Sequence, residues 1–173
     1  MPQRKAVLLR GVTPNGRSKI PNMTYLAQIL EEAGFGKVKV ILQTGNLMLE
    51  TSLDDEETKA LIHKTISDKL DADIVPVIKE ISQLKKIVAE NPFDDSYDQK
   101  CVRAVFTNDP IEEKLLQNLL AATPDLVPGS ECIYFYAPKN TGKRSFNNNF
   151  FERHLRICAT VRNLNVIEKL LSI

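Results

Sequence analysis

The order of apolar segments in the first 80 residues restricts the fold of this chain more than any other feature. A short apolar run over 5–10 predicts a buried strand. Apolar residues then repeat at helical spacing over 23–33, between Asn22 as an N-cap and Gly34 as a stop. The elements predicted next, in chain order, are strands over 38–42 and 47–50, a helix that opens with the acidic residues 54–57, and a strand over 73–78.

This order, β-α-β-β-α-β, is the split βαβ arrangement of ferredoxin-like folds. Such a fold is α+β, with both helices on one face of an antiparallel sheet. Pro76 lacks a backbone N–H, so it favours an edge or a bulge for the strand that contains it. We therefore predict a ferredoxin-like half over residues 1–80.

The second half, 81–173, has a less regular pattern. Ser82 can cap a helix that ends at Asn91-Pro92, and Asp109-Pro110 resembles a cap followed by the first residue of a helix. We expect an α/β half with a helical C-terminal tail that forms one compact unit with the first half. Its other predicted parts are strands over 101–106 and 131–136, and a tail from Asn147 of two short helices with residues 159–162 between them.

Charge is unevenly distributed along the chain. Residues 1–39 contain seven basic and two acidic residues, and residues 139–173 contain the same numbers, so each segment has a net charge of +5. Residues 40–138 contain nine basic and eighteen acidic residues, and the whole chain has a net charge of +1. Near-neutrality argues against non-specific coating of nucleic acid. If the two ends meet, they form a basic face for an anionic ligand; the alternative is ordinary surface solvation.

Several classes of protein are excluded or disfavoured. No stretch approaches the roughly 20 apolar residues that a membrane span needs. The apolar run near the amino terminus is too short for the hydrophobic region of a signal peptide. Cys101, Cys132 and Cys158 are typical of reduced core thiols, which predicts a cytoplasmic protein. His63 and His154 lie far apart without further ligands, so we predict neither a metal site nor a cofactor.

The loop after the first strand resembles a phosphate-binding loop. Gly11 to Ser18 fits G-x-x-x-x-G-K-[ST] with Arg17 in place of lysine. Pro14 removes a backbone donor, and the Asn22 cap places the helix start too far away to point at a phosphate, which argues against nucleoside-triphosphate hydrolysis. The remaining interpretations are an anion-contacting loop or a solvated connection. The basic residues of that loop are Arg10, Arg17 and Lys19.

Two other polar segments are candidates for ligand binding. The turn 43–46 offers the amides of Gln43 and Asn46, although turns favour such residues in any case. Arg144 lies in a basic segment followed by three asparagines, and such a segment either clamps phosphate or is plain surface.

The chain resembles the bacterial family catalogued as "domain of unknown function 1697". The matching segments are 8–12, 19–20, 34–35, 43–46, 91–93, 162–165 and 169–170. The resemblance implies an α+β protein with ferredoxin-like halves and no established activity. It places a shared site first among Arg10, Gly11, Gln43, Gly45, Asn46, Arg162, Asn163 and Asn165.

The chain departs from this family in two places. Pro14-Asn15 replaces a glycine pair, which weakens any claim of a glycine-rich loop, and Leu164 replaces a tryptophan, which removes a stacking surface. Asn163 also has a purely structural interpretation as the cap of the terminal helix.

The leading hypothesis is a cytoplasmic module that binds a phosphate-bearing small molecule or nucleic acid. Basic residues from both chain ends would supply charge, and Gln43, Asn46 and Asn163 would supply directional hydrogen bonds. The alternatives are an enzyme acting on a small polar substrate, with no catalytic residue singled out, and an interaction protein such as a homodimer.

Overall fold

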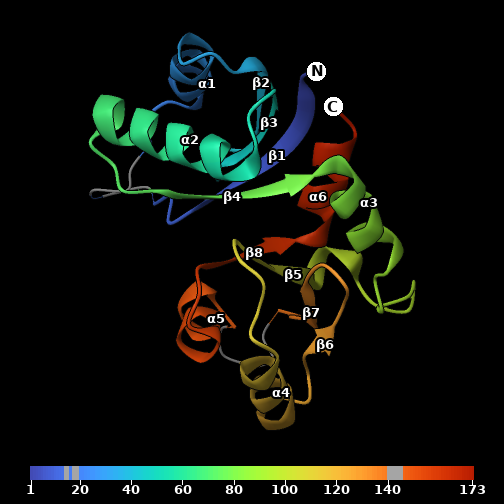
Figure 1. Ribbon diagram of the computed structural model, residues 1–173. Helices are drawn as coiled ribbons and strands as arrows, with labels where there is room; N and C mark the ends of the chain where they lie inside the picture. Colours follow the sequence, from blue (N-terminus) through green and yellow to red (C-terminus); the bar gives the residue numbers. More distant parts are fainter. Residues whose placement is uncertain (14–15, 17–19, 140–145) are drawn as a thin grey trace. The chain divides into compact units, whose positions relative to one another are not determined.

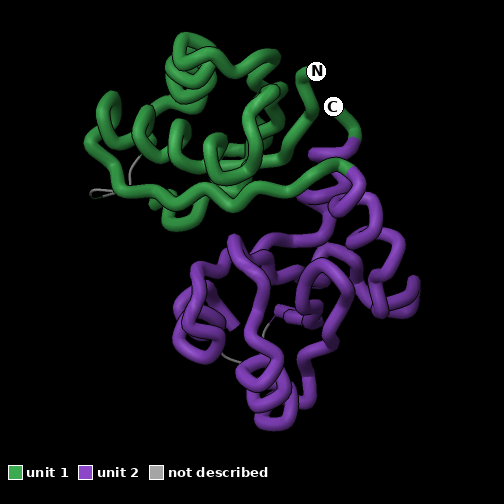
Figure 2. Tube along the Cα trace, in the orientation of Figure 1, with its two compact units in different colours: residues 1–81, 172–173 green, residues 82–171 purple. Residues whose placement is uncertain are grey.

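The computed structural model describes residues 1–13, 16, 20–139 and 146–173. The described chain forms two compact units (Figure 2). Unit 1 contains residues 1–81 together with the last two residues, Ser172 and Ile173, and unit 2 contains residues 82–171. Each unit has its own antiparallel four-stranded sheet.

Unit 1 has the predicted ferredoxin-like arrangement. Its strands lie in the order β2-β3-β1-β4, which places β1 and β3 at the centre. Figure 1 shows α1 and α2 on the same face of this sheet. The elements are β1 (Gln3–Arg10), α1 (Met23–Glu32), β2 (Gly36–Ile41), β3 (Asn46–Thr51), α2 (Asp55–Leu70) and β4 (Val75–Glu80).

The core of unit 1 follows from the alternation of side chains along its strands. Val7 and Leu9 of β1 face the two helices, where they pack in one buried cluster with residues such as Leu26 of α1 and Ile62 of α2. Lys5 shares this face because it lies two residues before Val7. Its side chain therefore lies inside the unit, where only 4% of it is exposed to solvent.

The local signals at the ends of these elements are confirmed. Asn22 caps α1 through its side chain, and Gly34 follows the helix with a φ of +107°. Asp54 and Glu57 form a capping box at the start of α2. Pro76 lies in β4, which is an edge strand as its missing N–H predicts.

Unit 2 repeats the topology of unit 1. Its strands lie in the order β6-β7-β5-β8, and its elements again run β-α-β-β-α-β (Figure 1). Unit 2 is therefore more regular than the sequence pattern predicted. Its elements are α3 (Ile81–Ala89), the short 3₁₀ helix η1 (Gln99–Cys101), β5 (Val102–Thr107), α4 (Glu113–Ala122), β6 (Val127–Pro128), β7 (Ile133–Tyr136), α5 (Asn148–Leu155), β8 (Ala159–Asn163) and α6 (Leu164–Leu171).

The two predicted tail helices are confirmed, but the segment between them is the strand β8. Thr160 and Val161 are β-branched and pair with Phe106 and Val105 of β5. The partner strand lies more than 50 residues earlier in the chain, so local pattern alone did not reveal the pairing.

Two predicted helix starts are wrong. The helix α4 begins at Glu113, and the hydroxyl of Thr107 donates to the carbonyl of Asp109, so the Asp109-Pro110 pair belongs to a turn before the helix. The helix α3 begins at Ile81, directly after β4, which places Ser82 inside the helix.

The structure also bears on the predictions of core thiols and of no membrane span. Cys101 and Cys132 are buried, Cys158 is half-buried, and all three are free thiols, as expected for core cysteines. None of the helices in the described residues has the length and apolar character needed to cross a membrane.

Tyr134 of β7 is the largest buried polar side chain of unit 2. Its hydroxyl donates to the carbonyl of Ile87 at 2.6 Å, which satisfies one of the carbonyls at the C-terminal end of α3. Burial raises the pKa of the Tyr134 phenol well above its ordinary value of about 10. The stability contributed by the neutral phenol is therefore complete below pH 10 and is lost as the pH rises further.

We expect Tyr134→Phe to cost about 1–2 kcal/mol of unfolding free energy at neutral pH. Above pH 10 the wild-type protein should lose about 1.4 kcal/mol per pH unit relative to Tyr134→Phe, because only its unfolded state ionises there. Urea unfolding of both proteins between pH 7 and pH 11 measures this difference. Tyr97→Phe, at a tyrosine that is 41% exposed, is the control. A constant difference between the two curves across this range would contradict the prediction.

Candidate ligand-binding site

A pocket of about 620 Å³ lies in unit 1 beyond the end of β1. Three segments surround it: the residues after β1, the start of α1, and the turn between β2 and β3. The described residues that line it are Val12, Thr13, Ile20, Pro21, Asn22, Met23, Thr24, Gln43 and Thr44. The first and third of these segments are the two loops that the sequence analysis singled out.

The turn between β2 and β3 is held in place by Asn46. This side chain is fully buried, and its amide donates to the hydroxyl of Thr44 at 2.9 Å and to the carbonyl of Ile41 at 3.4 Å. The backbone N–H of Leu9 donates to the carbonyl of Gly45 at 2.8 Å, which ties the turn to β1. Asn46 thus positions the polar groups of the turn.

Gly45 allows the turn to approach β1 closely. Its φ is +79°, and a Cβ atom at this position would lie 2.9 Å from Cβ of Leu9 and 2.9 Å from Cγ2 of Val12. A side chain is therefore opposed by both the backbone conformation and the space. This contact brings Gln43 and Thr44 beside Val12 and Thr13.

The start of α1 forms the third wall. Oδ1 of Asn22 accepts hydrogen bonds from the N–H groups of Thr24 at 2.8 Å and Tyr25 at 3.3 Å. The Oδ1 atom of Asn22 is therefore already engaged in capping α1. The hydroxyls of Thr13, Thr24 and Thr44 and the exposed amide of Gln43 are the other polar side-chain groups of the wall. None of the described residues that line this pocket carries a charge.

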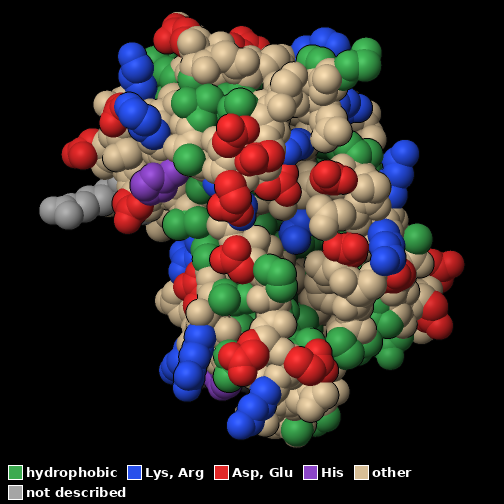
Figure 3. All heavy atoms as spheres, viewed as in Figure 1, with side chains coloured by type: hydrophobic (Ala, Val, Ile, Leu, Met, Phe, Trp, Pro, Cys, Tyr) green, Lys and Arg blue, Asp and Glu red, His purple; other side chains and the backbone are tan. Residues whose placement is uncertain are grey.

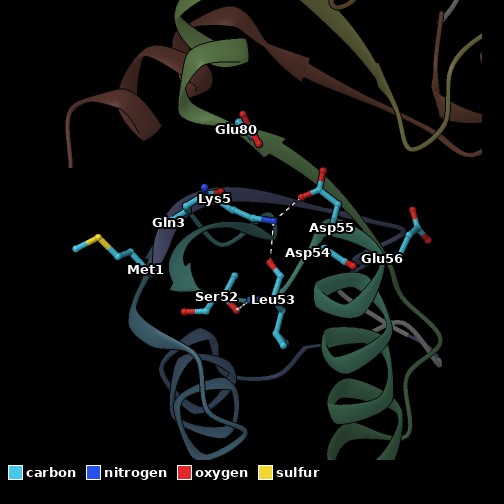
Figure 4. Close-up of a pocket in the computed structure, with 10 residues that line it drawn as sticks. Met1, Gln3, Lys5, Ser52, Leu53, Asp54, Asp55, Glu56 and Glu80 are labelled. Carbon is cyan, nitrogen blue, oxygen red and sulfur yellow. Dashed lines mark hydrogen bonds and ion pairs between the residues drawn. The ribbon is translucent and has the colours of Figure 1, made fainter.

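A second pocket of unit 1, about 580 Å³, lies at the opposite end of β1 (Figure 4). There the ammonium of Lys5 donates to Oδ1 of Asp55 at 2.6 Å and to the carbonyl of Leu53 at 3.1 Å. The lining also includes the carboxylates of Asp54, Glu56 and Glu80. Figure 3 shows acidic side chains gathered over the N-terminal end of α2. This pocket disfavours an anionic ligand, because its carboxylates outnumber its one basic side chain, that of Lys5.

The structure separates the predicted site residues of unit 1 into different environments. Gln43 lines the first pocket, whereas Gly45 and Asn46 shape the turn behind it. Gly11, with a φ of +92°, lets the chain turn after β1. Arg10 ends β1 at a position that alternates with Leu9, so it belongs to the face of the sheet opposite the helices and is not part of the pocket lining.

The remaining predicted residues lie elsewhere. Arg17, Lys19 and Arg144 are outside the described residues. Arg162, Asn163 and Asn165 belong to unit 2. The guanidinium of Arg162 donates to the hydroxyl of Thr160 at 2.5 Å and to the carbonyl of Val161 at 3.0 Å.

Asn163 directly precedes α6, as a cap would, yet it does not cap the helix. Its Oδ1 is buried and accepts no hydrogen bond from the described residues. The capping interpretation of Asn163 is therefore wrong for this atom.

The predicted site residues did not include the threonines of the first pocket or the buried ion pair of the second. Thr13 and Thr44 lie within the predicted loops, but a threonine in a turn has no distinctive pattern. Lys5 begins the apolar run of β1, and its burial depends on Asp55, which lies 50 residues away.

His63 pairs with Asp73 at 2.9 Å, and no group of metal-binding side chains is found in the part of the chain that the structure describes.

Comparison with known proteins identifies a family and a fold. The family model described as "Protein of unknown function (DUF1697)" matches residues 3–134. No curated protein matches the chain. The chain is similar to a solved structure, that of conserved bacterial protein SP0830 from Streptococcus pneumoniae, with a TM-score of 0.74 and 18% sequence identity. The similarity covers 99% of this chain and 98% of that chain, and it shows a common fold.

Proposed function

This chain belongs to the DUF1697 family of proteins of unknown function, and from that premise we propose that unit 1 binds a phosphate-bearing small molecule in the pocket beyond β1. The observation that supports this function is the composition of the pocket wall. Its described residues offer hydroxyl and amide groups from Thr13, Thr24, Gln43 and Thr44 but no carboxylate. Phosphate oxygens accept hydrogen bonds from such groups, and no negative side chain of the wall repels them.

The positive charge for the phosphate would come from the loop that leads into the pocket. In the sequence, Lys19 directly precedes Ile20, which lines the pocket, and Arg17 precedes Ile20 by three residues. The segment 1–39 that contains this loop has a net charge of +5. Arginine and lysine are the side chains that recognise phosphate, arginine through its planar fork and lysine as a point charge.

The size of the pocket favours a small molecule over a nucleic acid. Ligand pockets for small molecules commonly measure about 300–1,000 Å³, and this pocket measures about 620 Å³. The described lining also contains no histidine or carboxylate that could serve as a general acid or base, which favours binding over catalysis. Nucleic acid remains one arm of the test.

The proposal is tested by thermal unfolding at constant ionic strength with nucleotides, sugar phosphates, inorganic phosphate and short single- and double-stranded nucleic acids. A ligand at 100 times its Kd stabilises the folded state by about 2.7 kcal/mol, which raises the Tm of a chain of this length by about 5–10 °C. A rise with one class of phosphate compound supports the proposal. A flat response to all of them contradicts it, and a rise with nucleic acid alone assigns the site to a polymer.

The double variant Arg17→Ala/Lys19→Ala should weaken binding of the compound that binds best by about 100-fold or more, because each of the two charge-assisted hydrogen bonds contributes about 1.5–3 kcal/mol. Isothermal titration calorimetry measures this change. The matched control is Lys69→Ala/Lys85→Ala, which removes two exposed positive charges from α2 and α3. Equal affinity of the two double variants would show that the loop does not hold the phosphate.

A further inference from the structure

The common topology of the two units allows each residue of β1 to be compared with a residue of β5. In unit 1, Val7 pairs with Ile78 of the edge strand β4. In unit 2, Val105 pairs in the same way with Val161 of the edge strand β8. Two residues before these valines, on the same face of each sheet, lie Lys5 in unit 1 and Arg103 in unit 2. Both units therefore place a cation at the same position of the fold.

In unit 1 this cation has a counter-charge supplied by the protein. Lys5 forms its ion pair with Asp55 at the first residue of α2, and Glu80 lies directly opposite it on β4. Figure 4 shows the Lys5 side chain extending toward Asp55. The positive charge of Lys5 is thus neutralised at the end of the sheet.

In unit 2 the corresponding carboxylates are absent from these positions. Opposite Arg103 on β8 lies Asn163, at the position of Glu80. The helix α5 begins with Asn148, at the position of Asp55, and the Oδ1 atom of Asn148 accepts a hydrogen bond from the N–H of Val161 at 2.8 Å. Amides therefore replace both acidic residues that face the cation in unit 1.

The Arg103 side chain is half-buried and makes no hydrogen bond or ion pair with the residues that the structure describes. Its other cross-strand neighbour is Phe135, whose ring belongs to the apolar cluster of unit 2. A half-buried arginine whose cross-strand neighbour belongs to an apolar cluster, and which has no counter-charge among the described residues, favours an anion from outside the chain, because a partly desolvated charge gains from a partner.

A second observation at the same place also indicates an unseen partner. The Oδ1 atoms of Asn163 and Asn165 are buried and accept no hydrogen bond within the described chain. Buried side-chain oxygens are normally paired, and an orphaned one points to a water or a ligand that donates to it. Asn163 lies directly opposite Arg103 in the strand register, so the residue with the orphaned oxygen and the arginine are cross-strand neighbours on one face of the sheet.

We propose that Arg103 and Asn163 form an oxyanion-binding site in unit 2, separate from the pocket of unit 1. The guanidinium of Arg103 would hold a phosphate or carboxylate group through two parallel hydrogen bonds. The side chain of Asn163 would accept a hydrogen bond from a hydroxyl group beside the anion. The ligand thereby supplies the negative charge that Asp55 supplies to Lys5 in unit 1.

The test is a titration of the ¹⁵N-labelled full chain with inorganic phosphate and, separately, with malonate, both at constant ionic strength. The amide signals of β5 and β8 around Arg103 and Asn163 should shift with a Kd of about 1 mM or lower for at least one anion. The anion that shifts them distinguishes a phosphate site from a carboxylate site. Failure of both anions to shift these signals would overturn the proposal.

Variants distinguish this site from the pocket of unit 1. Arg103→Ala should weaken the anion by about 10- to 100-fold, whereas Arg153→Ala, which removes an exposed arginine from α5, should leave the affinity unchanged. Asn163→Asp restores the carboxylate of unit 1, so it should pair with Arg103, abolish anion binding and keep or raise the Tm. Unchanged affinity in both Arg103→Ala and Asn163→Asp would overturn the proposal, whatever the pocket of unit 1 binds.

Discussion

Gly45→Ala should destabilise unit 1 by about 2–4 kcal/mol. About 1 kcal/mol comes from the positive φ, which alanine adopts only with strain. The remainder comes from overlap, because the new Cβ would lie 2.9 Å from Cβ of Leu9, a backbone-proximal atom that cannot move aside without shifting β1. Urea unfolding followed by circular dichroism measures the change in the free energy of unfolding.

Gly11→Ala separates the two contributions. Gly11 also has a positive φ, of +92°, but no atom of the described residues lies within 4 Å of a Cβ built on it. This variant should therefore cost only about 1 kcal/mol. Equal losses in the two variants would show that backbone conformation alone requires glycine at the turn, and that the approach of the turn to β1 is not tight.

Asp55→Asn should destabilise unit 1 by about 2–3 kcal/mol at neutral pH. The ammonium of Lys5 is buried, and the change leaves it with the carbonyl of Leu53 and a neutral amide. Breaking a buried ion pair by removing one charge commonly costs about 3–5 kcal/mol. The expected loss is smaller here because 46% of the Asp55 side chain is exposed and water can approach the pair.

Two further variants test the cause of this loss. Glu56→Gln removes a carboxylate from the same helical turn. Among the described residues Glu56 pairs with Lys59, and 79% of the Glu56 side chain is exposed, so its effect should stay within about 1 kcal/mol. Lys5→Met removes the buried charge itself, and Asp55→Asn should cost less than about 1 kcal/mol in that background. If Asp55→Asn costs as much in the Lys5→Met background as in the wild type, then Asp55 stabilises the start of α2 and not the charge of Lys5.

The elements of unit 1 could be predicted because their signals are local. The Asn22 cap, the Gly34 stop and the acidic start of α2 each involve residues within one helical turn. The β-α-β-β-α-β order follows from these elements, and the order restricts the sheet to few topologies. Local signals were weaker in unit 2, where β6 has two residues and β8 depends on its pairing with β5.

The candidate site of unit 1 was predictable only in outline. The sequence patterns indicated the loop after β1 and the turn 43–46, and both loops contribute residues to one pocket. They also predicted ligand contacts for Asn46, and the amide of this residue donates hydrogen bonds to Thr44 and Ile41 within the turn. A polar side chain in a turn has the same identity in either role, so the distinction needs the coordinates of its partners.

The amino-acid sequence by itself determined which segments become helices and strands, because apolar spacing, caps and turn residues act over a few neighbouring positions. The tertiary structure alone decided which charges are neutralised. Lys5 and Arg103 lie near the starts of apolar strands, yet among the described residues a carboxylate pairs with Lys5 and none pairs with Arg103. Their surroundings come from strands and helix starts 30 to 75 residues away, and strand register brings those residues together.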